Sequence, residues 1–155
     1  MYNRIMKNML STSMSVLCLF GIVACYSLLN HEETTEAQCM ALNIYHEARG
    51  ESIEGQYAIA HVTLNRVAST RWPDSICDVV YQPYQFSWTH QIRDQQPKGN
   101  AWTVAKQAAA LVLSGEHKDN TGGADHYHAD YVNPYWSKDM DLTTIIGTHL
   151  FYKAR

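Results

Sequence analysis

The sequence lacks an excess of basic residues. The 155 residues include 12 lysines and arginines and 15 aspartates and glutamates, which gives a formal net charge of -3 and a pI near 6.2. Proteins that bind nucleic acids normally present a basic surface, so this balance argues against a nucleic-acid partner. Internal repeats and low-complexity tracts are missing as well. The length supports one domain with a single hydrophobic core.

Charged residues are missing over a long stretch near the N-terminus. After Arg4 and Lys7, no lysine, arginine, aspartate or glutamate occurs before Glu32. The uncharged run over residues 9–29 has about 20 residues, enough to cross a bilayer, and the basic residues before it favour a cytoplasmic N-terminus. The run also lacks the polar face that a surface helix needs. We therefore predict that residues 1–30 are a signal peptide or a weak signal anchor.

Three fates of this segment remain open. Serine, threonine, glycine and alanine dilute its hydrophobicity, so it resembles the weak signal anchors that some phage endolysins release from the membrane. Ile22-Val23-Ala24-Cys25 resembles a lipobox, in which Cys25 would become the lipidated first residue of the mature protein. Ordinary cleavage by signal peptidase is the third alternative. All three predict export to the periplasm or cell envelope, with a membrane contact through the N-terminal segment.

Cysteine is scarce, and its positions fit export. Cys18 and Cys25 lie in the N-terminal segment, whereas Cys39 and Cys77 lie in the rest of the chain. An exported protein folds in an oxidising compartment. We expect Cys39 and Cys77 to form a disulfide, which closes a loop of roughly 40 residues and contributes about 3–4 kcal/mol to stability. Two buried free thiols are the alternative.

Hydrophobic periodicity predicts an α+β domain over residues 37–155, after a polar linker at residues 31–36. The predicted helices are residues 35–48, a helix from Glu54 to a point before Trp72, a short helix capped by Asp74 or Ser75 that runs through Tyr81, and residues 101–113 capped by Asn100. Residues 85–99 are expected to be a loop. Aromatic and β-branched residues at 126–128 and 145–152 indicate short strands or extended segments. The domain is therefore mainly helical, with a small β element.

Glu47 is the first candidate for a catalytic residue, near the end of the first predicted helix. Apolar residues precede and follow it at helical spacing: Met40, Ala41, Ile44, Tyr45 and Ala48. The carboxyl group should therefore lie beside a packed stripe, where desolvation raises its pKa and suits it to general acid catalysis. The plainer alternative is that Glu47 pairs with Arg49 or caps a turn.

Four blocks of sequence resemble the cell wall hydrolase family typified by the spore cortex-lytic enzyme SleB. They are Tyr45 to Glu51, Glu54 to Val67, Cys77 to Gln82 and Gln85 to Trp88. The resemblance implies a lysozyme-like domain that cuts the glycan strands of peptidoglycan, with Glu47 as the catalytic acid. This chain has His46 where SleB has glycine, which is expected to change the surroundings of the acid.

A convincing second carboxylate is missing. Many glycosidases use two carboxyl groups, and the candidates here are Glu51, Glu54, Asp125 and Asp130. Glu51 would share a helical face with Glu47 only if the helix continued through Gly50. Lytic transglycosylases use one glutamate as acid and then as base, while the 6-hydroxyl of the sugar closes a 1,6-anhydro ring. The resemblance allows this route or hydrolysis by a muramidase, and the missing partner favours the lytic route.

Aromatic and amide side chains supply what a glycan cleft needs. We expect substrate binding by Gln85, Phe86, Ser87 and Trp88, although Phe86 could equally be a core residue. A weaker similarity to the same family includes Tyr127, His128 and residues 133–136. It implies that these residues form the opposite wall of the cleft, with Tyr127 as the hydrogen-bond partner nearest the acid.

Histidine is abundant, with eight residues, and suggests a rival chemistry. His126 and His128 would share one face of a strand, where a zinc amidase could use them. His46-Glu47 begins like His-Glu-x-x-His, but Gly50 stands where the second histidine belongs. We therefore predict no metal and no other cofactor. A zinc-dependent peptidoglycan amidase and a noncatalytic wall-binding lysis protein are the alternatives to a monomeric peptidoglycan glycosidase.

Overall fold

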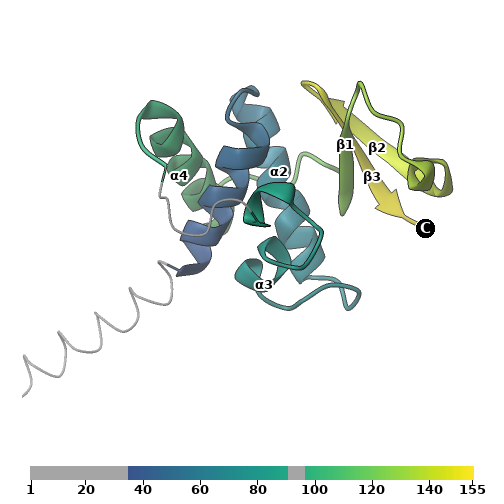
Figure 1. Ribbon diagram of the computed structural model, residues 1–155, viewed down its shortest axis with the longest axis horizontal. Coiled ribbons are helices and arrows are strands. Elements are labelled where there is room, and N and C mark those ends of the chain that lie inside the picture. The colour runs from purple at the N-terminus through teal and green to yellow at the C-terminus, as the bar shows by residue number, and fades with distance from the viewer. Residues whose placement is uncertain (1–34, 91–96) are drawn as a thin grey trace, which may run out of the picture. The chain divides into compact units, whose positions relative to one another are not determined.

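The computed structural model describes residues 35–90 and 97–155, and residues 36–155 form one compact unit. The predicted signal or anchor segment lies outside the described residues. Within those two ranges, no helix is long and apolar enough to cross a bilayer. Helices form the first part of the unit and a three-stranded sheet forms the last part (Figure 1). The predicted α+β class, mainly helical with a small β element, is confirmed.

The helical part surrounds one apolar core. Its α-helices are residues 35–48, α2 (Ile53–Val67), α3 (Ile76–Val80) and α4 (Asn100–Leu113). Met40 and Ile44 of the first helix are fully buried in a cluster that includes Ala60 of α2 and Ala105 of α4. The apolar stripe beside Glu47 therefore faces this core, as the helical spacing predicted.

Two of the helices start at serine caps, and α4 does not follow that pattern. Ser52 accepts a hydrogen bond from the backbone N–H of Gly55, and Ser75 accepts one from Asp78. The cap predicted at Asn100 is wrong, because Gly99 occupies that position with φ 86° and Asn100 is already helical. Glycine adopts a positive φ without a steric penalty. The backbone turn at Gly99, and not a side-chain cap, sets the start of α4.

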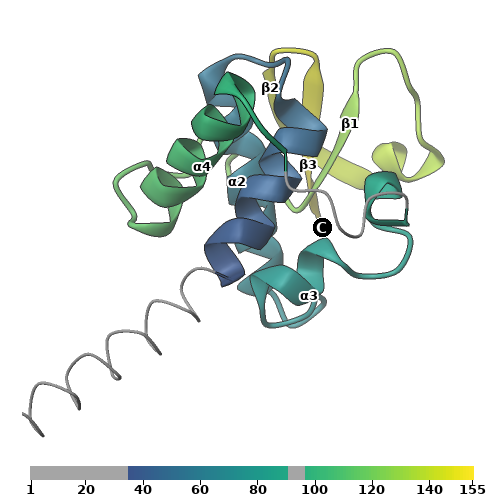
Figure 2. The same cartoon turned by 60° about the vertical axis from the view of Figure 1, so that its left-hand side comes forward.

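The sheet is antiparallel, with strand order β1-β3-β2 (Figure 2). Its strands are β1 (His126–Ala129), β2 (Met140–Ile146) and β3 (His149–Ala154). The extended segment predicted over residues 145–152 is in fact part of a hairpin, because the chain reverses at Gly147, whose φ is 58°. A register shift between Leu142 and Thr144 interrupts the alternation of side chains. Because of this irregularity, the first half of β2 lacks the alternating sequence pattern of a regular strand.

Two short 3-10 helices lie in the connections, η1 (Ser87–His90) and η2 (Tyr135–Asp139). The predicted loop over residues 85–99 therefore contains one helical turn. A second apolar cluster, which includes Ala48 and Phe151, joins the helices to the sheet, and Tyr127 packs against both clusters. Since Ile44 belongs to the first cluster and Ala48 to the second, Glu47 lies where the helical core meets the sheet.

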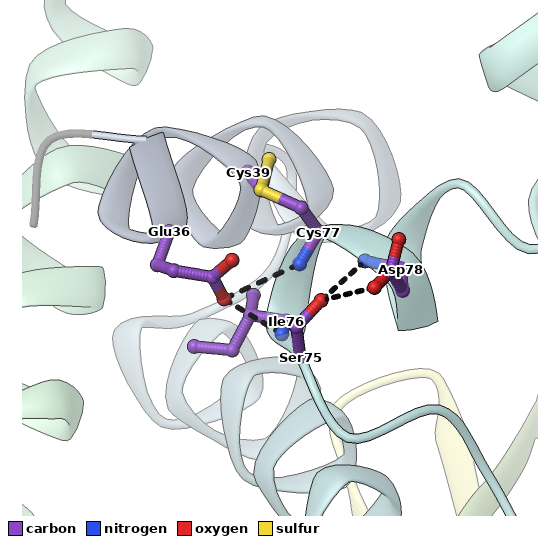
Figure 3. Close-up of a disulfide and its surroundings, with 6 residues drawn as sticks. All are labelled: Glu36, Cys39, Ser75, Ile76, Cys77 and Asp78. Atoms are coloured by element: carbon purple, nitrogen blue, oxygen red, sulfur yellow. Dashed lines mark hydrogen bonds between the residues drawn. A yellow bond between two sulfur atoms is a disulfide. The ribbon is translucent and has the colours of Figure 1, made fainter. Parts of the chain in front are cut away.

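The disulfide predicted between Cys39 and Cys77 is present (Figure 3). It joins the first turns of the helix at residues 35–48 to α3, with 5.3 Å between the two Cα atoms. The carboxylate of Glu36 strengthens the same junction, because its Oε2 accepts hydrogen bonds from the backbone N–H groups of Ile76 (2.6 Å) and Cys77 (3.3 Å). The helix that carries Glu47 is thus held at its start by a covalent bond.

Candidate active site

Glu47 lies in the last turn of the helix at residues 35–48 and is half-buried. Its Oε2 accepts a hydrogen bond of 2.9 Å from the hydroxyl of Tyr127, in the middle of β1. Burial raises the pKa of Tyr127 well above its ordinary value, so the phenol keeps its proton and remains a donor. The alternative pairing of Glu47 with Arg49 is not seen, since the guanidinium of Arg49 lies over the ring of Tyr45.

Burial also raises the pKa of Glu47 above its ordinary value. The hydrogen bond from Tyr127 opposes this shift, and so does the nearby indole of Trp88, followed by the charge of Arg66. The indole N–H is buried and close to the carboxylate, although it makes no hydrogen bond of normal geometry. Desolvation dominates, which favours the neutral form of the acid.

His46 packs against Trp88. The two rings are stacked, with centroids 4.4 Å apart and an angle of 21° between their planes. Burial lowers the pKa of His46, and the charge of Arg49 lowers it further, so this imidazole is neutral at neutral pH. His46 therefore adds an uncharged ring next to Trp88, the side chain that borders the carboxylate of Glu47.

Arg66 of α2 connects the helices to the residue just before β1 and lies close to Glu47. The residue is buried, and its Nε donates a hydrogen bond of 2.8 Å to the backbone carbonyl of Asp125. Its guanidinium lies 4.4 Å from the ring centroid of Trp72 and 5.6 Å from that of Phe86. A buried cation close to Glu47 stabilises the carboxylate once the proton has left, and its charge opposes part of the rise in the pKa of Glu47.

A pocket of about 540 Å³ opens over Glu47. Its lining residues are Glu47, Tyr84, Gln85, Phe86, Ser87 and His90. Three of the four residues predicted from the segment at 85–88 therefore face the pocket, and Phe86 does so while it is also part of the core. Trp88 is buried beside the carboxylate. The pocket has the mixture of amide, hydroxyl and aromatic groups that suits a sugar.

Tyr127 and His128 lie on opposite faces of β1. Tyr127 contacts the acid, whereas His128 stacks on Tyr152 and hydrogen-bonds to its hydroxyl at 3.0 Å. The other ring nitrogen of His128 contacts the carbonyl of Ala129 at 2.9 Å. Successive side chains of a strand point to opposite faces, which explains the separation. Tyr127 belongs to the site, and His128 does not line the pocket.

The histidines of β1 are engaged in other contacts as well. His126 shares the face of His128, as predicted, but its Nδ1 bonds to Asp125 at 2.8 Å. Both ring nitrogens of His128 already have partners. Within residues 35–90 and 97–155, no group of three or more histidine, cysteine, aspartate or glutamate side chains is arranged to hold a metal ion.

Glu51 lies in a different environment from Glu47. Its carboxylate accepts hydrogen bonds from the hydroxyl (2.6 Å) and the backbone N–H (3.2 Å) of Thr148, in the turn between β2 and β3. The bond from the Thr148 hydroxyl is the main reason that the pKa of Glu51 is lowered. Glu51 therefore fastens the hairpin to the helical part and does not line the pocket.

The other carboxylates considered as partners of the acid do not line the pocket either. Glu54 accepts a hydrogen bond of 3.1 Å from Asn120. Asp125 is buried and pairs with Arg71 and His126. Asp130 is exposed and follows β1. Among the described residues that line the pocket, Glu47 is the one carboxylate.

Sequence reasoning missed Tyr84, His90 and the packing role of Arg66. Tyr84 and His90 lie just outside the family-like block at residues 85–88, so the resemblance did not include them. Arg66 is within a family-like block, but its burial beside the rings of Trp72 and Phe86 has no local signal. A basic residue at the end of a helix is normally exposed.

Comparison with known proteins agrees with this architecture. A sequence profile of the cell wall hydrolase family matches residues 50–152. The spore cortex-lytic enzyme of Halalkalibacterium halodurans is 34% identical over 117 residues, which are 75% of this chain and 34% of that protein. The spore cortex-lytic enzyme of Bacillus cereus is 33% identical over 125 residues, 80% of this chain and 46% of that protein. The chain thus spans less than half the length of these relatives.

Two solved structures are similar in both sequence and fold. The catalytic domain of the Bacillus cereus SleB protein is 32% identical, with a TM-score of 0.67 over 76% of this chain and 89% of that domain. The catalytic domain of the germination-specific lytic transglycosylase SleB from Bacillus anthracis is 33% identical, with a TM-score of 0.65 over 76% of this chain and 93% of that domain. By its sequence profile and its fold, the chain belongs to the cell wall hydrolase family.

Proposed function

We propose that this chain cleaves the glycan strands of peptidoglycan as a lytic transglycosylase, with Glu47 as general acid and then general base. One observation carries the proposal: among the described residues that line the pocket, Glu47 is the one carboxylate, and it is half-buried, has a raised pKa and is held by Tyr127. The similarity to a Bacillus anthracis catalytic domain described as a lytic transglycosylase supports the same reaction.

In the first step, the neutral carboxyl group of Glu47 gives its proton to the bridging oxygen of the glycosidic bond. The bond between that oxygen and C1 breaks, and the sugar ring takes up positive charge. The newly formed carboxylate is stabilised by the hydrogen bond from Tyr127 and by the positive charge of Arg66. Hydrogen bonds to charged groups are stronger than neutral ones, so this support increases as the proton leaves.

In the second step, the 6-hydroxyl of the same sugar attacks C1 and closes a 1,6-anhydro ring. Glu47 accepts the hydroxyl proton, which regenerates the acid for the next cycle. The acetamido group of the substrate supports the cation between the steps, so the enzyme needs no second carboxylate. Glu51, Glu54 and Asp125 are occupied by other partners, in agreement with this route.

The pocket residues next to Glu47 are proposed to bind the glycan. Gln85 and Ser87 supply an amide and a hydroxyl, while Phe86 supplies aromatic surface to the pocket lining. Trp88 and Tyr127 contact the acid and do not need to touch the sugar. Their role is to hold the carboxylate where the bridging oxygen arrives, because positioning is a large part of catalysis.

Product analysis by mass spectrometry tests this proposal. Purified peptidoglycan treated with the protein should yield fragments with 1,6-anhydro ends, and Glu47→Gln should yield none. Reducing ends in their place would retain glycan cleavage but identify a muramidase. Freed stem peptides, with activity abolished by a chelator, would identify an amidase and contradict the proposal. Wall binding without any cleavage would identify a noncatalytic lysis protein.

We also propose that the enzyme works outside the cytoplasm. The disulfide between Cys39 and Cys77 supports an oxidising compartment, and the uncharged N-terminal run provides the means of export. Mass analysis of the mature N-terminus distinguishes its fates: a retained Met1 indicates a signal anchor, a lipid on Cys25 indicates a lipoprotein, and a new N-terminus up to Gln38 indicates cleavage. A cytoplasmic protein that carries Met1 would contradict export, and size-exclusion chromatography tests the expected monomer.

A further inference from the structure

Tyr84 has a backbone conformation that is unusual for a tyrosine. Its φ is 67°, and among the described residues it is the one non-glycine with positive φ. The five other positive-φ positions in those ranges are glycines: Gly99, Gly115, Gly122, Gly123 and Gly147. A side chain with a Cβ is strained in this region, and a bulky aromatic residue is a genuine outlier there. The tyrosine therefore destabilises its own turn.

Packing inside the protein does not offset this strain. The Tyr84 residue is 92% exposed, which makes it the most exposed of the large hydrophobic residues in the described ranges. Among the described residues, its ring has one ring neighbour, His90, at a centroid distance of 6.0 Å and a tilt of 45°. An exposed ring contributes little hydrophobic stabilisation to the folded chain. A glycine at this position would give a less strained turn.

The location of Tyr84 suggests what the ring is for. It lines the same pocket as Glu47, together with His90 and Ser87. Strained backbone conformations concentrate at functional sites, where the position of a side chain matters more than local stability. An exposed aromatic face at a polar pocket suits the apolar C–H face of a pyranose ring. When the sugar binds, it shields the aromatic ring from water.

We propose that Tyr84 is a sugar-binding platform at the mouth of the pocket, where it stacks on a pyranose ring of the glycan strand that flanks the bond to be cut. The proposal rests on the glycan-cleaving function given above. His90 forms the adjacent aromatic side of this platform. Since Tyr84 binds away from the reacting bond, it contributes equally to the substrate complex and the transition state. Such uniform binding lowers KM and leaves kcat unchanged.

Substitutions at Tyr84 should change stability and binding in opposite directions. Tyr84→Gly relieves the strain, so the melting temperature should rise by about 1–3 °C, with part of the gain lost to the greater freedom of glycine in the unfolded chain. The same variant should raise the apparent KM for solubilised glycan strands about tenfold, at nearly unchanged kcat. Tyr84→Asn should behave similarly, because asparagine tolerates this φ but has no ring. Tyr84→Trp should keep the KM near that of the wild type.

Two measurements separate this proposal from the function on which it depends. Tyr131→Ala removes another exposed tyrosine, 85% exposed and outside the pocket lining, and should leave KM unchanged. Calorimetric binding of glycan fragments to the Glu47→Gln protein, with and without Tyr84→Gly, reports the affinity without turnover and should show the same tenfold loss. An active enzyme with an unchanged KM in Tyr84→Gly overturns the platform alone. A wild-type protein that neither binds nor cleaves glycan overturns both proposals.

Discussion

Glu47 and Glu51 are one helical turn apart in the sequence and have opposite environments. Glu47 is half-buried where the helical core meets the sheet, and burial raises its pKa. Glu51 follows the end of that helix and receives two hydrogen bonds from Thr148, which lower its pKa. The comparison teaches that the surroundings decide whether a glutamate holds a proton or gives it up. One region raises the pKa of its glutamate, and the other uses its glutamate to fasten a hairpin.

Exchanging each glutamate for glutamine is the most direct way to break this comparison. Glu47→Gln keeps the shape of the side chain but removes the transferable proton, so wall clearing should fall by about a hundred- to ten-thousandfold. Turbidity of a peptidoglycan suspension measures the loss, and circular dichroism checks the fold. Glu51→Gln is the matched control and should lose much less activity. A folded Glu47→Gln protein that keeps more than about a tenth of the activity would refute the role of Glu47.

The two ends of the helix that carries Glu47 are held by different interactions. Its start is fixed by the disulfide between Cys39 and Cys77, and the residues after its end are fixed by Glu51. Cys39→Ser should lower the free energy of unfolding by about 3–4 kcal/mol, because the open loop has more freedom in the unfolded chain. Chemical denaturation measures this change, and the reduced wild-type protein should match the variant. An unchanged stability would show that the cross-link is not needed.

Removal of the hydrogen-bond donor of Tyr127 tests how the surroundings of Glu47 set its pKa. Tyr127→Phe deletes the hydrogen bond to Glu47, so the pKa of Glu47 should rise further and the charged form should be less stable. Activity should fall about ten- to hundredfold, since hydrogen bonds to charged groups are worth roughly 1.5–3 kcal/mol. The pH-rate profile should shift so that the Glu47 limb moves to higher pH. A loss of activity with an unmoved profile would indicate a packing defect instead.

The smallest effect is expected for the contribution of Glu51 to stability, which depends on pH. Its folded-state pKa is lowered, so its contribution to stability is present above the unfolded value of 4.5 and is lost as the pH falls through the lower folded value. Glu51→Gln should cost about 1 kcal/mol at pH 7, reduced by solvent screening, and nothing at low pH. Thermal denaturation of both proteins across this range measures the difference. A gap that persists below pH 3 would point to lost packing.

The contrast between the two glutamates was only partly predictable from the sequence. Helical spacing placed Glu47 beside Ile44 and Ala48, and Gly50 indicated that Glu51 lies beyond the helix. The disulfide between Cys39 and Cys77 was also predicted, because an exported chain folds in an oxidising compartment. The bonds from Thr148 to Glu51 have no such signal, because they join residues that are far apart along the chain and meet through a hairpin turn.

The errors in the sequence-based interpretation have specific causes. Gly99 replaces Asn100 at the start of α4 because the backbone there needs a positive φ. His128 was predicted to share a wall of the cleft with Tyr127, but it lies on the opposite face of β1, so its part in substrate binding stays a prediction. Tyr84 was overlooked because it lies just outside the family-like block at residues 85–88.

The sequence by itself determined the local framework of this protein: the periodic helices, the serine cap of α3 at Ser75, and a glutamate at the end of an apolar stripe. Tertiary structure alone decided the chemistry of that glutamate. Tyr127 is 80 residues away from Glu47, and it reaches the carboxylate only because the sheet packs on the helices through Phe151. Periodicity and capping are local along the chain, whereas desolvation and charge act through space. The acid therefore acquires its raised pKa only when the chain has folded.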